Sequence, residues 1–235
     1  MNKAVIVSAK RTPIGSFSGS LASKSAVELG TTAIKALLNE TNINVSEIDE
    51  VIMGNVLSAG LGQAPARQAA IFAGLPDKTE CLTINKMCGS GLKAVMLAHQ
   101  AILLGDAKTV VAGGLESMTN APYLLPGARN GYRVGDAKIK DSMIMDGLWD
   151  VYNNIHMGSC ADSCAKDYKL SREELDDFAV ESYRRAQKAQ ENGIFNDEIV
   201  PVEVKSRKET VLVENDEEPF KTNFDKIPKL KPVFD

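Results

Sequence analysis

One cysteine lies where an apolar run meets a glycine-rich turn and a long segment with helical periodicity. The stretch is TINKMCGSGLKAVMLAHQAILLGD, residues 83–106, and its cysteine is Cys88. A cysteine just before a helix N-terminus lies in the positive field of unpaired N–H groups, which favours a thiolate. Gly89 and Gly91 leave the backbone bare for a bulky substrate, and the Cys88 amide can donate to an oxyanion. The pattern is typical of a nucleophile for acyl transfer; a small cysteine buried at a tight turn is the structural alternative.

The other cysteines do not form a pattern of metal ligands. Cys160 and Cys164 are one helical turn apart, and Cys81 stands alone before Cys88. A structural zinc site normally shows two spaced pairs of ligands, and the sequence has no second pair. We therefore expect no metal site and, for a chain inside the cell, reduced thiols.

The elements that must position Cys88 alternate between strands and helices. The patterns predict strands at 4–7, 50–57, 81–85 and 109–112, and helices at 25–39, 65–73 and 89–104. Ser25 and Glu28 form a capping box at the first helix, and Pro65 opens the second. Strands that alternate with helices indicate an α/β fold with a largely parallel sheet covered by helices.

The pattern changes after the two glycines at 113–114. Residues 118–150 carry turn residues and scattered charge without a clean period. Helices are expected at 158–168 and 171–191, the second opened by a capping box of Ser171 and Glu174. Strands are expected at 199–205 and 211–213, and the charged, proline-containing stretch 214–235 predicts neither a helix nor a strand.

The composition is that of an ordinary soluble α/β protein. The chain has 235 residues, 44% of them hydrophobic and 25% charged, with a net charge of −4; it is long enough to bury a core. This balance gives no reason to expect nucleic acid or an anionic membrane as a partner. No run approaches the ~18 apolar residues of a membrane span, and the apolar run 4–7 is too short for a signal peptide. We expect a cytoplasmic protein.

The segment around Cys88 resembles the nucleophile signature of the thiolase family, and further segments along the whole chain resemble thiolases in the same order. They are RTPIG (11–15), GNVLSAGLGQAPARQAA (54–70), NKMCGSG (85–91), GGLESMTNAPY (113–123), DGLWD (146–150), HMG (156–158), SREELDDFA (171–179) and DEIVPV (197–202). Within the family, the motifs are most similar to those of bacterial members that act on acetyl-CoA.

The resemblance implies a fold. Thiolases have two similar βαβαβαββ halves whose sheets sandwich two central helices, and a loop domain inserted in the first half reaches over coenzyme A. Residues 1–117 would be most of the N-terminal half, with the nucleophile, and residues 118–235 would be the loop domain. The C-terminal half would be absent from this sequence. Thiolases of this kind are usually tetramers, so the resemblance implies a homo-oligomer built as a dimer of dimers.

The resemblance also implies a reaction. Cys88 takes an acetyl group from acetyl-CoA, and a second acetyl-CoA then attacks the acyl-enzyme to give acetoacetyl-CoA and CoA; thiolysis is the reverse. The backbone amide of Cys88 would form part of the oxyanion hole. CoA thioesters are substrates, and no cofactor is implied.

Several parts of the family's machinery are missing from the sequence. The histidine of a G-H-P segment, the second cysteine of a C-x-G-G-G segment and the asparagine of an N-E-A-F segment do not occur. Without a positioned base and a second acid/base, the condensation cannot run. We therefore expect the 235-residue polypeptide to be inactive alone as a thiolase.

Four further residues are candidate contacts for the CoA thioester. By resemblance, His156 and Met157 line the pocket beside the short acyl group and pantetheine, and Leu148 touches the pantetheine. Many thiolases have Pro-Arg-Phe-Gly where this chain has Glu-Pro-Phe-Lys at 218–221. The arginine is absent, and Lys221 could replace it only as a point charge. For each of these residues, ordinary packing or a solvated surface is the alternative.

Two other functions remain open on the sequence alone. A condensing enzyme of the ketoacyl-synthase kind shares the fold and a cysteine at a strand–helix joint, although the motifs fit thiolases better. A non-catalytic fragment that binds CoA or assembles with other subunits is the second alternative, and the missing motifs favour it.

Overall fold

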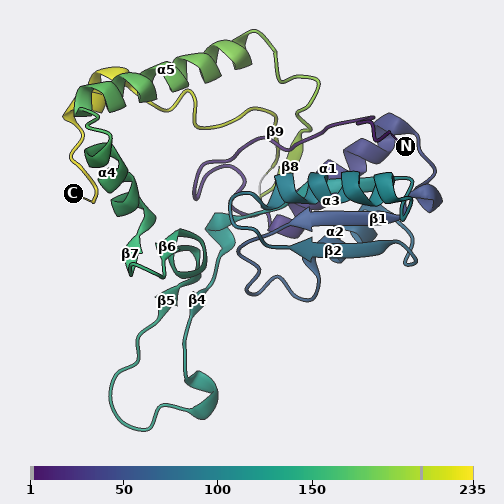
Figure 1. Ribbon diagram of the computed structural model, residues 1–235, viewed down its shortest axis with the longest axis horizontal. Helices are drawn as coiled ribbons and strands as arrows, with labels where there is room; N and C mark the ends of the chain where they lie inside the picture. Colours follow the sequence, from purple (N-terminus) through teal and green to yellow (C-terminus); the bar gives the residue numbers. More distant parts are fainter. Residues whose placement is uncertain (1–2, 207–208, 235) are drawn as a thin grey trace.

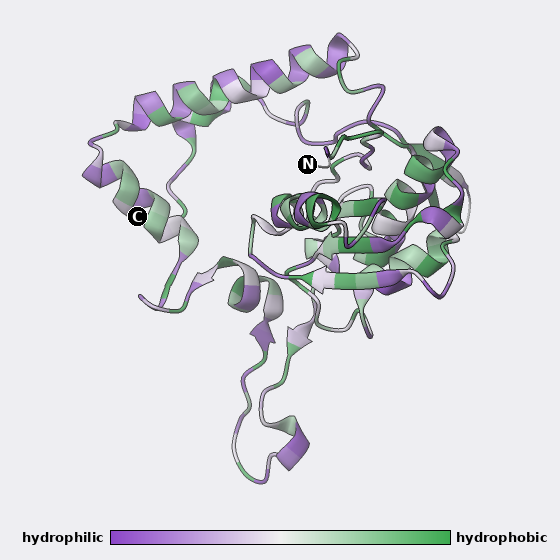
Figure 2. Cartoon of the chain, turned by 45° about the vertical axis from the view of Figure 1, so that its right-hand side comes forward, coloured by the Kyte–Doolittle hydropathy of each residue, from purple (hydrophilic) through white to green (hydrophobic). Residues whose placement is uncertain are grey.

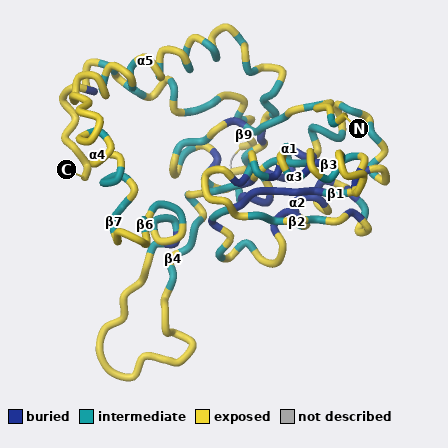
Figure 3. The backbone as a smooth tube through the Cα atoms, in the orientation of Figure 1, coloured by how far each residue is buried: buried dark blue, intermediate teal, exposed yellow. Residues whose placement is uncertain are grey.

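The computed structural model of the chain describes residues 3–206 and 209–234. The first part of the chain forms a packed α/β unit, at the right of Figure 1, and the later elements extend away from it as an arm and a helical segment. The buried residues shown in Figure 3 are concentrated in the α/β unit, while the arm is largely exposed.

A three-stranded parallel sheet is the centre of this unit. Its strands are β1 (Glu50–Gly54), β2 (Glu80–Ile84) and β3 (Val110–Gly114), in the order β2-β1-β3. β1 pairs with both neighbours over its whole length. Because all three strands are parallel, their carboxyl ends meet at one edge of the sheet. Strand β2, which leads to Cys88, ends at this edge.

Three α-helices cover the sheet: α1 (Ala26–Thr41), α2 (Pro65–Ala73) and α3 (Ser90–Leu104). α2 packs on β1 and β2 and against α1, whereas α3 packs on β1 and β3. Their buried apolar side chains and those of the strands form one core cluster: Ala26, Val27, Ile34, Ile48, Val51, Met53, Ala66, Ala69, Ala70, Ala73, Leu75, Val111 and Leu115. The predicted parallel sheet covered by helices is therefore confirmed.

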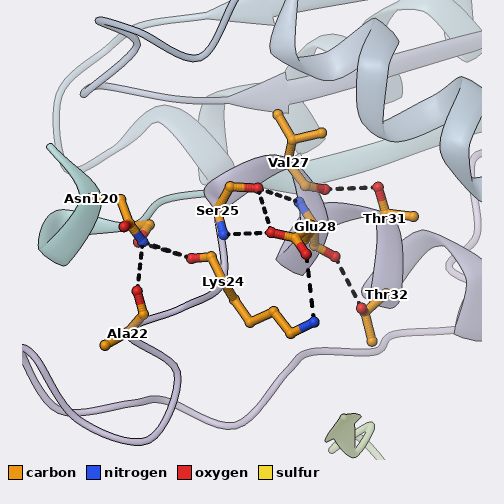
Figure 4. Close-up of polar contacts among 9 residues, drawn as sticks. Ala22, Lys24, Ser25, Val27, Glu28, Thr31, Thr32 and Asn120 are labelled. Atoms are coloured by element: carbon orange, nitrogen blue, oxygen red, sulfur yellow. Dashed lines mark hydrogen bonds and ion pairs between the residues drawn. The ribbon is translucent and has the colours of Figure 1, made fainter. Parts of the chain in front are cut away.

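The capping box predicted at the first helix is present (Figure 4). The Ser25 hydroxyl accepts from the Glu28 N–H at 3.2 Å, and the Glu28 carboxylate accepts from the Ser25 N–H at 2.9 Å. Beside the cap, the Asn120 side-chain amide donates to the carbonyls of Ala22 and Lys24. Asn120 thereby ties the loop before α1 to the segment that follows β3.

The buried strand predicted at residues 4–7 is wrong. The segment is extended but pairs with no described strand, and Val5, Ile6 and Val7 are 74%, 82% and 69% exposed. A strand forms only where a neighbouring edge lies within about 5 Å in the hydrogen-bonding direction. Here an apolar cavity lies between residues 4–10 and β3, so the apolar sequence has no edge to pair with.

The part of the chain after β3 contains short hairpins and two long helices. They are β4 (Tyr123–Leu124), β5 (Lys140–Asp141), β6 (Trp149–Asp150), β7 (Ile155–His156), α4 (Met157–Asp167), α5 (Arg172–Glu191), β8 (Val202–Lys205) and β9 (Thr210–Val213). The 3₁₀ turns are Val45–Glu47, Met118–Asn120, Ala128–Asn130 and Phe224–Lys229, and Met143–Leu148 is a π-helix. β4 and β5 form the base of the arm that projects in Figure 1, and α5 is mostly hydrophilic in Figure 2.

The capping box predicted at Ser171 is present at α5. The strand predicted to start at residue 199 starts at Val202 instead, because residues 199–200 pair with the N-terminal loop: the Val200 N–H donates to the Arg11 carbonyl, and the Arg11 N–H to the Glu198 carbonyl, both at 2.8 Å. The Arg11 guanidinium also pairs with Asp216. These contacts hold the N-terminal loop against the last third of the chain.

The expectation that no run approaches a membrane span is also wrong. Among the described residues, Met87–Leu104 is long and apolar enough by length and composition, with a mean hydropathy of 1.3. Lys93 and His99 interrupt the run, yet its average hydropathy stays high. This segment includes α3, which packs on β1 and β3, and 17% of the segment is buried inside the structure.

Candidate active site

Two glycines at the ends of β1 and β3, Gly54 and Gly114, let the start of α3 approach that edge of the sheet. A Cβ at Gly54 would lie 2.5 Å from the Ser90 Cβ and 2.8 Å from the Gly91 nitrogen, so no side chain fits there. A Cβ at Gly114 would lie 3.7 Å from the Gly91 Cα, an ordinary contact with the first turn of α3. Bare backbone at these strand ends therefore allows the N-terminus of α3, with the turn before it, to approach the sheet closely.

The turn that carries Cys88 is held by side chains on both sides of it. The Ser90 hydroxyl accepts from the Lys86 N–H at 2.9 Å and donates to the Met87 carbonyl at 2.6 Å. The Asn85 side chain accepts from the Met87 N–H at 2.9 Å. Met87 has a φ of +49°, a conformation that costs a non-glycine residue energy and that clusters at functional sites. The sequence alone predicts no role for Asn85 or Ser90.

Cys88 lies on the outside of this turn and is exposed. It is therefore not the buried cysteine of the structural alternative. Gly89 caps the helix without a side-chain hydrogen bond, and the Cys88 N–H has no acceptor among the described residues. The sulfur and this amide thus lie together at a helix N-terminus, where an anion is favoured.

Cys88 borders an apolar cavity of about 430 Å³, a size typical of small-molecule sites. The cavity is lined by Gly54, Val56, Leu57, Met87, Cys88, Ser90, Gly91, Gly114, Leu115, Glu116, Met118, Gly147 and Leu148. Leu148, singled out from the sequence, is therefore close to Cys88. The sequence alone does not predict Leu57 and Met118 as lining residues. Both follow the carboxyl ends of parallel strands, β1 and β3, and that position is the sequence signal that points to them.

Glu116 supports one wall of this cavity. One carboxylate oxygen accepts from the Asn55 side chain at 2.7 Å and from the Leu57 N–H at 3.0 Å, and the other accepts from the Val56 N–H at 2.8 Å. Glu116 thereby fastens the loop after β1 to the end of β3. Hydrogen bonds to a carboxylate are stronger than neutral ones, so this part of the wall is firmly held.

His156 and Met157 do not line the cavity at Cys88. His156 caps α4: its Nδ1 accepts from the Gly158 N–H at 2.9 Å, and its ring stacks on Phe234 with 4.6 Å between centroids. Because Nδ1 is the acceptor, a neutral ring carries its proton on Nε2. Met157 is the first residue of α4 and is half exposed.

Lys221 is paired with other residues of this chain. Its ammonium donates to the Glu217 carboxylate and, at 2.7 Å, to the Ser16 hydroxyl. The Glu217 carboxylate also accepts from the Ser16 and Ser20 N–H groups. The Lys221 hydrogen bond, followed by that of Ser16, lowers the pKa of Glu217 to about 2. This cluster joins the loop at 16–20 to the segment at 217–221.

The remaining cysteines lie outside the cavity. Burial raises the pKa of the Cys81 thiol, which donates to the Thr79 carbonyl. Cys160 contacts Asp150 with 3.8 Å between sulfur and carboxylate oxygen, and Cys164 is exposed on α4. Within residues 3–206 and 209–234, no three His, Cys, Asp or Glu side chains gather where they could hold a metal ion.

Known proteins are similar to this chain over its full length. Residues 4–235 match the family model described as thiolase, N-terminal domain. The chain is 52% identical over 235 residues to an acetyl-CoA acetyltransferase of Yarrowia lipolytica, 54% over 243 residues to one of Cupriavidus necator, and 51% over 235 residues to a mitochondrial one of Danio rerio. Each alignment covers 100% of this chain but 58%, 60% and 56% of the relative, respectively.

The chain therefore spans about three fifths of the length of these relatives. The matched region includes the parallel sheet, the turn with Cys88 and the cavity beside it. Since the family model matches nearly every residue, the chain belongs to the thiolase family.

Proposed function

We propose that this chain carries the acyl-accepting site of an acetyl-CoA acetyltransferase and that Cys88 is its nucleophile. The observation that carries the proposal is the exposed Cys88, with an unpaired backbone N–H, beside an apolar cavity at a helix N-terminus. The relatives' names support acetyl-CoA as the donor.

The first half-reaction follows from this geometry. The Cys88 thiolate attacks the thioester carbonyl of acetyl-CoA, and the oxyanion that forms accepts a hydrogen bond from the Cys88 N–H. The carbon–sulfur bond to CoA then breaks, leaving acetyl-Cys88 and CoA thiolate, which takes up a proton from water. A second acetyl-CoA, as its α-carbanion, would attack the carbonyl of acetyl-Cys88, breaking the carbon–sulfur bond to give acetoacetyl-CoA and the free Cys88 thiolate; thiolysis would be the reverse.

The other candidate contacts differ in their support. Leu148 lines the cavity, so it is suited to pack against the acyl group or pantetheine of the substrate. From the family resemblance alone, His156 and Met157 are proposed to line the pocket beside the short acyl group and pantetheine; in this structure they lie at the start of α4, outside the cavity at Cys88. Lys221 contacts a phosphate of CoA only if it leaves Glu217 and Ser16.

Domain limits, assembly and location complete the proposal. The core cluster lies entirely between residues 26 and 115, which supports a nucleophile domain at 1–117 and a CoA-covering, assembly-forming loop domain at 118–235. We propose a homo-tetramer, because exposed apolar side chains such as Val134 and Ile139 project on the arm. We propose a cytoplasmic location, although some relatives are named mitochondrial.

A non-catalytic fragment is the second candidate function. None of the residues that line the cavity is a histidine or a second cysteine, so the general base expected of a thiolase is absent from this site. This observation favours a chain that binds or accepts an acyl group without turning over.

Iodoacetamide labelling of the whole chain at pH 7 tests the proposal. We expect Cys88 to react at least tenfold faster than Cys164, which is also exposed but lies within α4, and acetyl-CoA to slow the labelling of Cys88 alone. Equal rates at the two cysteines, or equal protection of both, would refute a nucleophile site at Cys88.

A further inference from the structure

The proposed reaction leaves one residue of the Cys88 turn, Lys86, without a role. Lys86 is exposed and stands two residues before Cys88. Its described hydrogen bonds are those of its backbone: the N–H donates to the Ser90 hydroxyl at 2.9 Å, and the carbonyl accepts from the Gly89 N–H at 3.2 Å. Unlike the ammonium of Lys221, that of Lys86 has no partner within residues 3–206 and 209–234.

The turn holds Lys86 and Cys88 close together. The two residues are the partners of an isolated β-bridge, and bridge partners lie beside each other on the same face. Because consecutive Cα atoms are about 3.8 Å apart, the Cα atoms of residues 86 and 88 are separated by no more than about 7.6 Å. A lysine side chain has a flexible four-carbon stem, which can span that separation. The Lys86 amine can therefore reach an acyl group on the Cys88 sulfur.

The amine reaches Cys88 from the solvent side. Lys86 does not line the cavity beside Cys88, although Met87 and Cys88 both do, and the Cys88 side chain is exposed as well as facing the cavity. An acetyl group on the sulfur is thus open to attack from outside the cavity. The next lysine along the chain, Lys93, is half-buried on α3 and follows Cys88 by five residues.

We propose that Lys86 takes the acetyl group from acetyl-Cys88, so that the chain acetylates itself at Lys86. This inference rests on the proposed acetylation of Cys88. The unprotonated Lys86 amine attacks the thioester carbonyl carbon, and the Cys88 N–H donates to the oxyanion. The carbon–sulfur bond then breaks, the Cys88 sulfur leaves as a thiolate, and the nitrogen gives up a proton to water. The products are an acetyl-Lys86 amide and a free Cys88 thiolate.

Two physical arguments favour the transfer. Attack within one turn is intramolecular, and groups held together react as if each were present at very high concentration. The lining of the cavity contains no histidine and no second cysteine, so the acid/base that would form the carbanion, and thereby remove the acetyl group by condensation, is absent. Acetyl-Cys88 therefore persists long enough for a slow transfer to an amine that is mostly protonated near neutral pH.

Acetylation of the whole chain by acetyl-CoA at pH 8 tests the transfer. Peptide mass spectrometry before and after hydroxylamine separates the two products, because hydroxylamine removes an acetyl group from sulfur but not from a lysine amide. Cys88→Ala cannot form the thioester, and Lys86→Arg keeps the positive charge without an amine to acetylate. Lys35, exposed on α1, reports direct acetylation by acetyl-CoA, and Lys35→Arg is the matched control variant.

We expect at least tenfold more hydroxylamine-resistant acetyl on Lys86 than on Lys35 in the wild type, and equal amounts on the two lysines in Cys88→Ala. After acetyl-CoA is removed, the acetyl group on Cys88 should last at least threefold longer in Lys86→Arg than in the wild type, whereas Lys35→Arg should match the wild type. Equal acetylation of Lys86 in the wild type and in Cys88→Ala, or acetylation of Lys93 in its place, would overturn the proposal.

The same spectra separate this inference from the proposed function of Cys88. An acetyl group on Cys88 in Lys86→Arg, together with no acetyl group on Lys86 in the wild type, would overturn the transfer alone and leave Cys88 as the nucleophile. No acetyl group on Cys88 in either protein would overturn both.

Discussion

Cys88 is positioned by its neighbours more than by its own side chain. The Ser90 hydroxyl and the Asn85 side chain fix the turn, and Gly54 provides the space in which that turn reaches the strand ends. The sequence predicts the cysteine at the joint, because cysteine and glycines are adjacent in the chain. The contribution of Gly54 comes from a residue that is distant in sequence, so it emerges only from the fold.

Gly54→Ala is predicted to destabilise the chain at this joint. The new methyl group would meet the Ser90 carbonyl carbon at 2.7 Å and the Gly91 nitrogen at 2.8 Å, and such overpacking costs about 1–3 kcal/mol. Gly113→Ala in β3 is the matched control, since its methyl group would lie an ordinary 3.7 Å from the Met53 sulfur. Urea unfolding measures both, and equal free energies of unfolding for the two variants would show that the close approach is unimportant.

For the helices and strands, the sequence predicts the features that depend on residues close together in the chain. Both capping boxes, at Ser25 and Ser171, were predicted because their partners are three residues away. Residues 4–7 have the composition of a buried strand, but a strand also needs an edge, and the cavity beside β3 removes it. Likewise, Lys221 was expected to meet CoA, and its pairing with Glu217 and Ser16 depends on two segments that meet only in the fold.

The Glu217 cluster makes stability depend on pH. The folded-state pKa of Glu217 is lowered to about 2 from its ordinary 4.5, so its contribution is fully present above pH 4.5 and is lost as the pH falls toward 2. We expect the free energy of unfolding of Glu217→Gln to approach that of wild type as the pH is lowered from 5 to 2.

The exposed neighbour Glu218 provides the control. Glu218→Gln should follow the wild-type stability at every pH, because no described contact holds its carboxylate. Chemical denaturation at pH 7, 4 and 2.5 measures all three proteins. A stability difference between wild type and Glu217→Gln that is constant over this range would exclude the proposed linkage.

The whole molecule exposes 15854 Å², more than the about 10,300 Å² expected of a compact protein of 25.3 kDa. The core cluster occupies the α/β unit, while the arm, α4 and α5 bury few side chains (Figure 3). A parallel sheet covered by helices and the family were predictable, because strand and helix periods and motifs are local. The cavity at Cys88 was only partly predictable, since Leu57, Glu116, Met118 and Leu148 meet there from separate strand ends and a later segment.

The chain alone is predicted not to turn over. Its two histidines, His99 and His156, are absent from the lining of the cavity at Cys88, and so is a second cysteine. The carboxylate of Glu116 lines the cavity but accepts hydrogen bonds from Asn55, Val56 and Leu57. The helix N-terminus can favour the Cys88 thiolate for acyl transfer, but the site lacks the second acid/base that would form the carbanion. Incubation with acetoacetyl-CoA and CoA should give acetyl-CoA at no more than the rate of Cys88→Ser. Turnover above that background would contradict the prediction.

The central claim, that Cys88 accepts the acyl group, is tested most directly by mapping acetylation after incubation with acetyl-CoA. Peptide mass spectrometry should find a hydroxylamine-sensitive acetyl group on the Cys88 peptide of the wild type and of Cys164→Ser, and none in Cys88→Ser. An acetyl group on Cys164 to the same extent as on Cys88, or no acetyl group on Cys88, would contradict the account.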